Sequence, residues 1–90
     1  MNYRPVYTKK AFSDLASFSK KDAKRILDKI NYYCSQKSPL LHAKKLQDPK
    51  FGTYRFRIGD YRAIFDIDKN GNITILLILT IKHRKDIYKF

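Results

Sequence analysis

The sequence predicts an α+β fold in which an N-terminal strand and a two-helix hairpin pack on a mainly antiparallel sheet of about four strands, followed by a short C-terminal helix or turn. Two observations support this prediction. Apolar residues recur at helical spacing between residues 9 and 34, and they alternate with polar residues from residue 53 onward, which is typical of strands buried on one face. The 90 residues are enough for one domain, residues 1–90, with one compact core.

The first half of the chain predicts one strand and two helices. Residues 3–7 form a short extended segment, and Pro5 favours an edge strand because proline lacks a backbone donor. Thr8 and Ser19 are suitable N-caps for the two helices. The first helix is expected to turn Asp14 to solvent and to bury Ala11, Phe12, Leu15 and Phe18. The second is expected to bury Ala23, Ile26, Leu27, Ile30, Tyr33 and Cys34.

The second helix also carries a basic face, which includes Lys20, Lys21, Lys24, Arg25 and Lys29. A solvated surface is the simpler interpretation, because charged residues occupy the exposed face of any amphipathic helix. An RNA-binding face is the alternative. The following residues, 35–52, are polar and interrupted by proline and glycine, which predicts a long loop with one strand or turn at residues 42–46. His42 is expected on the surface of that loop.

Two alternating runs on either side of Gly59-Asp60 predict a β-hairpin with a two-residue turn. This turn sets the register, so that Arg57 lies opposite Arg62. The core face then comprises Tyr54, Phe56, Ile58, Tyr61, Ala63, Phe65 and Ile67. The other face presents Arg55, Arg57 and Arg62, although like charges in cross-strand register are destabilising. A bound phosphate explains this arrangement, and long side chains that splay into water are the alternative.

The stretch D-x-D-x-N-G at residues 66–71 matches the first half of a calcium-binding loop. The twelfth position of that loop is Leu77, and the sequence has no glutamate to supply the bidentate ligand. A turn is therefore the better interpretation. It leads into residues 73–81, which are apolar on both faces and predict a central strand that is covered on both sides. The end of this strand then lies beside Arg62, and the basic tail begins near the arginines.

Twenty Lys and Arg residues against eight acidic residues, all of them aspartate, give a formal net charge of +12. A hydrophobic content of 43% is too high for a disordered basic tail, so the charge belongs to a folded domain that attracts an anionic partner. One cysteine allows no internal disulfide, and no apolar run approaches the ~20 residues of a membrane span. The first residues lack the apolar segment of a signal peptide. We expect a cytoplasmic protein without membrane association.

Arginine stays protonated, so the three arginines can hold a phosphate but cannot act as a base. The titratable residues expected nearby are Lys82, His83, Lys85 and Tyr88, and histidine is the type that titrates nearest neutrality. No cluster of carboxylates is evident on this face to hold a catalytic metal. Cleavage of RNA by attack of its own 2′-hydroxyl therefore remains open, as does simple phosphate binding.

The motif Y-R-F-R-I-G-D-Y-R at residues 54–62, followed by a long apolar strand and H-R-K-D-I-Y at residues 83–88, resembles the RelE/ParE superfamily of toxins from toxin–antitoxin systems. The resemblance covers nearly the whole chain. For the RelE branch, which we favour, it implies a ribosome-dependent endoribonuclease that cuts mRNA, inhibits translation and leaves a 2′,3′-cyclic phosphate. We expect no metal, because no carboxylate cluster is evident, and no cofactor. The expected partners are the ribosome, mRNA and a cognate acidic, RelB-like antitoxin.

The resemblance also implies roles for individual residues. Arg62 matches the arginine that stabilises the phosphate, and Tyr88 matches a C-terminal catalytic tyrosine, although an anchoring role is equally compatible with it. A second arginine position falls on Arg84 or on Lys82, of which we favour Arg84. His83 is a candidate for proton transfer. The remaining RNA or phosphate contacts are Arg55, Arg57, Lys82 and Lys85, with Arg57 also a catalytic candidate.

Arg55 and Arg57 stand where the RelE branch often has lysine, which leaves the general base open. This departure keeps two alternatives. One is a ParE-like toxin that inhibits DNA gyrase and is not a nuclease. The other is a basic RNA-binding module without catalysis.

Overall fold

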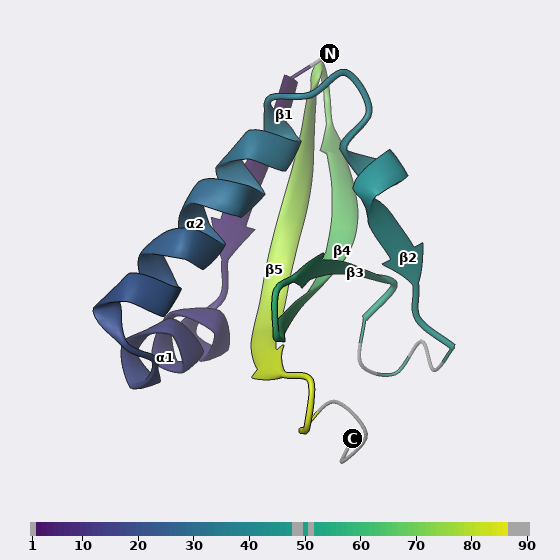
Figure 1. The fold of residues 1–90 in the computed structure, drawn as a ribbon. Coiled ribbons are helices and arrows are strands. Elements are labelled where there is room, and N and C mark those ends of the chain that lie inside the picture. Colours follow the sequence, from purple (N-terminus) through teal and green to yellow (C-terminus); the bar gives the residue numbers. More distant parts are fainter. Residues whose placement is uncertain (1, 48–49, 51, 87–90) are drawn as a thin grey trace.

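Five strands form one mixed sheet in the computed structural model, which describes residues 2–47, 50 and 52–86 (Figure 1). The strands are β1 (Asn2–Tyr7), β2 (Ala43–Lys45), β3 (Tyr54–Ile58), β4 (Tyr61–Asn70) and β5 (Ile73–His83), in the spatial order β1-β5-β4-β3-β2. The helices are α1 (Lys9–Ser17), α2 (Lys20–Cys34) and the short 3₁₀ helix η1 (Pro39–His42). β1 pairs parallel with β5, and the other neighbours pair antiparallel.

The predicted α+β fold with a mainly antiparallel sheet is confirmed, with five strands instead of about four. The additional strand is β2, which falls in the stretch where a strand or turn was expected. After β5 the chain makes a turn, in which the Asp86 N–H donates to the His83 carbonyl at 2.8 Å. Pro5 lies in an edge strand, as expected, because β1 has β5 on one side and no described strand on the other.

Both helices begin at the predicted caps. The side chain of Thr8 accepts a hydrogen bond from the Ala11 N–H at 3.1 Å, and Ser19 accepts one from the Asp22 N–H at 3.1 Å. These bonds satisfy donors that the first turn of a helix leaves without an intrahelical partner. The cap at Ser19 therefore begins α2 directly after the end of α1.

The two helices bury one face each against the sheet. In α2 the buried residues are Ile26, Ile30, Tyr33 and Cys34, and they join Phe56, Phe65, Leu76 and Ile78 of the sheet in one core. In α1 Ala11 and Leu15 are buried, but the predicted burial of Phe12 is wrong, because that side chain is 61% exposed. Residue 12 is rotated about 100° from Ala11 around the helix axis. Its side chain therefore lies outside the narrow buried face of this short helix.

Asp14 was expected to face solvent, but it accepts hydrogen bonds from the Thr80 hydroxyl at 2.5 Å and the Ile81 N–H at 2.9 Å. The reason lies in the lengths of two strands. β1 pairs with β5 only as far as Tyr7 opposite Ile78, so the backbone of β5 beyond that point needs another partner. Asp14 supplies that partner from α1.

The β3–β4 hairpin has the predicted register. Ile58 pairs with Tyr61 and Arg57 with Arg62 around the two-residue turn, where Gly59 has φ +58°. A positive φ of this kind is easily adopted by glycine, and it matches the twist of the two strands.

β5 lies centrally, as predicted, between β1 and β4. Its expected coverage on both faces is only partly observed. Thr74, Leu76 and Ile78 are buried on the helix side, whereas the intervening residues Ile75 and Leu77 are half-buried. The helices pack against one face of the sheet, so the opposite face, which we call the outer face, stays more open. No described helix has the length and apolar character that a membrane span requires.

Candidate nucleic-acid interface

Three cationic residues lie side by side across the three adjacent strands β3, β4 and β5. Arg57 is paired with Arg62, and Arg62 is paired with Lys82. Directly opposed residues in antiparallel strands have Cα atoms about 4.5–5.5 Å apart and point to the same face. We call Arg57, Arg62 and Lys82 the cation row. It lies on the outer face because alternation places neighbouring Phe56 and Ala63 in the core.

Arg55 adds a second line of charge beside the cation row. It lies two residues before Arg57, and its neighbours in register are Lys44 of β2 and Ile64 of β4. Ile64 is fully buried although it lies outside the main core, because Gly52 and Leu79 cover it on the outer face. The sequence alone does not indicate a role for Lys44, because only the pairing of β2 with β3 brings it next to an arginine.

The position of Arg62 is fixed by the hairpin turn. Its Nη1 donates to the carbonyl of Gly59 at 2.9 Å and to the carbonyl of Tyr61 at 2.9 Å. These bonds hold one end of the guanidinium against the turn. A planar guanidinium held in this way is suited to a phosphate, whose oxygens it can bind through parallel hydrogen bonds.

The chain beyond β5 is attached to the tip of the same hairpin. The Arg84 N–H donates to the carbonyl of Asp60 at 2.7 Å, and the Arg84 Nε lies 3.5 Å from Oδ1 of that aspartate. Arg84 therefore lies at the hairpin tip and has an acidic partner there. Lys85 follows on the exposed surface.

His83 lies on the other face of the sheet from the cation row. It is paired with Tyr61, and their rings meet edge to face with centroids 5.5 Å apart. Its Nδ1 accepts a hydrogen bond from the Lys85 N–H at 3.2 Å. The structure thus separates His83 from the arginines, although Lys82 beside it in the chain joins them. Tyr88 lies outside the described residues.

The D-x-D-x-N-G stretch forms the end of β4 and the following turn. Oδ1 of Asp66 accepts hydrogen bonds from the Thr53 N–H at 2.8 Å and from the Thr53 hydroxyl at 2.7 Å. The preference for a turn over a calcium loop fits this geometry. Among residues 2–47, 50 and 52–86, no three His, Cys, Asp or Glu side chains are grouped so that they could hold a metal ion.

The geometry therefore offers fixed positive charge on an open sheet face. Side chains of this kind bind phosphate oxygens and stabilise negative charge that develops on them. Lys82 is the member of the cation row that is able to exchange a proton, since arginine keeps its charge at any working pH.

Comparison with solved structures places this fold among toxins. An archaeal RelE–RelB complex from Pyrococcus horikoshii OT3 matches with a TM-score of 0.67 and 28% identity, covering 93% of this chain and 97% of the matched one. The RelB–RelE antitoxin–toxin complex from Methanococcus jannaschii matches with a TM-score of 0.61 and 29% identity, covering 93% and 95%. The toxin–antitoxin complex RelBE2 from Mycobacterium tuberculosis matches with a TM-score of 0.63 and 26% identity, covering 93% and 100%.

A search of curated proteins gives no match. A family model, described as the ParE toxin of the type II toxin–antitoxin system parDE, matches residues 6–88 and so includes every described residue of the cation row. The predicted resemblance to the RelE/ParE superfamily is confirmed by this match together with the three structures. The chain belongs to the ParE toxin family of type II toxin–antitoxin systems.

Proposed function

We propose that this toxin is a ribosome-dependent, metal-independent endoribonuclease that cuts mRNA and thereby inhibits translation. The observation that carries the proposal is the cation row, in which Arg57, Arg62 and Lys82 stand in cross-strand register on the open face of the sheet. Like charges opposed in this way destabilise a sheet, so the arrangement favours a ligand that supplies negative charge. The likeness to three RelE-type chains supports RNA as that ligand.

The proposed reaction uses a nucleophile within the RNA itself. The 2′-oxygen attacks the adjacent phosphorus, a base takes the hydroxyl proton, and the bond to the 5′-oxygen of the next nucleotide breaks as that oxygen receives a proton. The products are a 2′,3′-cyclic phosphate and a 5′-hydroxyl end. The protein contributes orientation of the phosphate and stabilisation of the charge on its oxygens.

The roles of the residues follow from their chemistry. Arg62 and Arg57 stabilise the reacting phosphate, and Arg84 adds charge from the hairpin tip. Arg55, Lys82 and Lys85 contact the neighbouring RNA. Proton transfer is proposed for His83 or Tyr88, the residues that the resemblance implies, although the His83 ring packs on Tyr61 on the face opposite the cation row.

We further propose that an acidic antitoxin binds this protein. The three matched structures are complexes of a toxin with its antitoxin, and the net charge of +12 calls for an anionic partner. An antitoxin that covers the cation row would block phosphate binding and would inhibit the toxin in this way.

Programmed ribosomes incubated with the purified toxin test the proposal. The wild type should cut mRNA and leave cyclic phosphate ends, and Arg62→Ala should slow cleavage by about 10²–10³-fold, as expected when one stabilising donor is lost. Arg4→Ala is the matched control. Arg4 pairs with Ile75, about 23 Å along β5 from Lys82, and the variant should cut normally.

Inhibition of DNA gyrase is the second candidate function, and the match to the ParE family model favours it. A supercoiling assay run with the same protein separates the two. Gyrase inhibition without any mRNA cleavage would overturn the ribonuclease proposal.

A further inference from the structure

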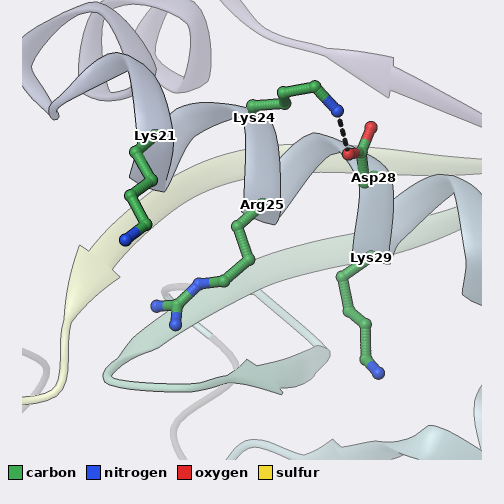
Figure 2. A pocket seen from close by; sticks show the side chains of 5 residues that line it. All are labelled: Lys21, Lys24, Arg25, Asp28 and Lys29. Carbon is green, nitrogen blue, oxygen red and sulfur yellow. Dashed lines mark hydrogen bonds and ion pairs between the residues drawn. The ribbon is translucent and has the colours of Figure 1, made fainter.

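Helix α2 carries an open pocket of about 410 Å³ whose lining side chains are all charged. They are Lys21, Lys24, Arg25, Asp28 and Lys29 (Figure 2). Lys24 donates to Asp28 at 2.6 Å, so these two charges offset each other. The other three side chains extend away from the Lys24–Asp28 pair, and Arg25 points toward the β3–β4 hairpin (Figure 2). We call Lys21, Arg25 and Lys29 the α2 stripe.

The α2 stripe is a line of like charges on one helix. Its members are spaced four residues apart, so neighbours lie about 6 Å apart along the axis and the whole stripe spans about 12 Å. Like-charge pairs at this spacing destabilise a helix by roughly 0.2–0.5 kcal/mol each. A nucleic-acid strand carries one phosphate per ~3.4 Å of helix axis, so the stripe matches the length of about three to four phosphates.

The α2 stripe and the cation row meet at the hairpin turn. A Cβ added at Gly59 would lie 2.7 Å from Nη2 of Arg25, so this guanidinium rests directly against the turn. The carbonyl of Gly59 also accepts the hydrogen bond from Arg62. The Tyr61 hydroxyl donates to Asp22 of α2 at 3.0 Å and joins helix and hairpin. The two groups of cations are therefore held in a fixed relation on either side of one turn.

An aromatic ring stands at the end of the α2 stripe. Tyr32 is 52% exposed, and Nζ of Lys29 lies 5.3 Å from its ring centroid. It follows Arg25 by seven residues, or two helical turns, and so lies on the same helix face. Cations next to exposed aromatic rings are typical of nucleic-acid surfaces, where bases stack on the ring. All five residues that line this pocket are charged, and four of them are cationic, which favours a polyanion as the ligand.

We infer that the α2 stripe is a second binding surface, separate from the cation row, for the phosphate backbone of a nucleic acid, with Tyr32 available for stacking. This surface adds affinity and orientation and breaks no bond. It therefore does not depend on the proposed cleavage reaction, and a toxin that cuts no RNA would still use it.

Binding to two uncleavable probes tests the inference. These are a single 2′-O-methyl RNA strand and a single DNA strand of the same sequence, each titrated by fluorescence anisotropy at several salt concentrations. The test variant carries Lys21→Gln, Arg25→Gln and Lys29→Gln. The control variant carries Lys9→Gln, Lys37→Gln and Lys69→Gln at exposed positions off the α2 stripe, and it loses the same charge.

We expect the test variant to lower the slope of log K against log salt by about 2, because each phosphate contact with a single strand contributes about 0.7. The control should change that slope by less than about 1. Comparison of the two strands shows whether the surface binds RNA or DNA more tightly. Equal slopes for the two variants would overturn the inference, and so would a test variant that loses an acidic antitoxin peptide but keeps the wild-type slope.

Discussion

Arg57 lies directly opposite Arg62 in the β3–β4 hairpin, on the open face of the sheet. Two like charges in this position should destabilise the fold. Removal of one charge should therefore stabilise the protein and weaken its binding of RNA. We predict that Arg57→Gln raises the free energy of unfolding by about 0.2–1 kcal/mol at low salt, while it weakens RNA binding. Urea denaturation at low and high salt measures the first effect, which should shrink as salt screens the pair.

Arg4→Gln on β1 is the control for this prediction, because Arg4 is paired with Ile75 and not with a cation. It should leave stability within about 0.5 kcal/mol of the wild type. A loss of stability in Arg57→Gln would show that Arg57 makes favourable contacts that outweigh the repulsion.

Asp14 makes the fold sensitive to acid. Its partial burial acts to raise its pKa, yet the pKa lies below the ordinary value of 3.8. Hydrogen bonds from Lys10, Thr80 and the Ile81 N–H outweigh the burial. A lowered pKa in the folded state means that ionised Asp14 stabilises the protein above about pH 4, and that this contribution is lost as the pH falls through the lowered value.

Asp14→Asn tests this. We expect a loss of about 1.5–3 kcal/mol near pH 7, since the hydrogen bonds are made to a charged group, and a smaller difference from the wild type near pH 2. Urea midpoints across this pH range give the comparison. Asp28→Asn removes an exposed carboxylate paired with Lys24 and should cost no more than about 0.5 kcal/mol. The prediction would be contradicted if the difference in urea midpoint between Asp14→Asn and the wild type were as large near pH 2 as near pH 7.

Most of the fold could be predicted from the sequence because its strands are joined by short turns. The Gly59-Asp60 turn fixes the pairing of Arg57 with Arg62, and it depends only on neighbouring residues. The next turn alone would place Ile81 opposite Arg62. A register shift between Ile64 and Phe65, which no local signal predicts, brings Lys82 there instead. The contacts of Asp14 could not be predicted in this way, because they depend on where β1 stops along β5, more than sixty residues away in sequence.

The candidate site also combines features that local sequence predicts with features that depend on tertiary structure. Strict alternation from the buried residues Leu76 and Ile78 would have placed Lys82 on the helix side and His83 on the outer face, and the register shift between Ile64 and Phe65 reverses both. The contact between Arg25 and Gly59 also depends on tertiary structure, because α2 packs over the hairpin. A basic helix face on its own is compatible with a solvated surface, and only the packing shows that it lies next to the cation row.

Gly52 should be the least replaceable glycine among the described residues. It has φ +140°, and an added Cβ would lie 2.5 Å from Cγ2 of Ile64 and 3.2 Å from Cδ1 of Leu79. Gly71 has φ +64° with nothing within 4 Å of an added Cβ. We predict that Gly52→Ala costs about 3 kcal/mol, from strain and overpacking, and that Gly71→Ala costs about 1–2 kcal/mol. Thermal denaturation shows which variant loses more stability. Equal losses of stability in the two variants would show that the outer face adapts to the Cβ added at residue 52.

The Asp60–Arg84 pair should affect activity more than stability. Both side chains are more than half exposed and 3.5 Å apart, so breaking the ion pair should change the free energy of unfolding by less than about 1 kcal/mol. The backbone hydrogen bond from Arg84 to Asp60 remains in Asp60→Ala, so the chain keeps its path and the guanidinium loses its orientation. Cleavage of mRNA on the ribosome should then fall about tenfold, in line with about 1.4 kcal/mol of lost positioning.

A double-mutant cycle shows whether Asp60 acts through Arg84. If it does, Arg84→Ala alone and the double variant should cleave mRNA at the same rate, because Asp60 has nothing left to position. Asp68→Ala removes an exposed carboxylate farther along β4 and should leave the rate unchanged. Losses that multiply in the double variant would mean that the two residues act independently. Arg84 would then reach the RNA without help from the hairpin tip, and the role of Asp60 would be its charge alone.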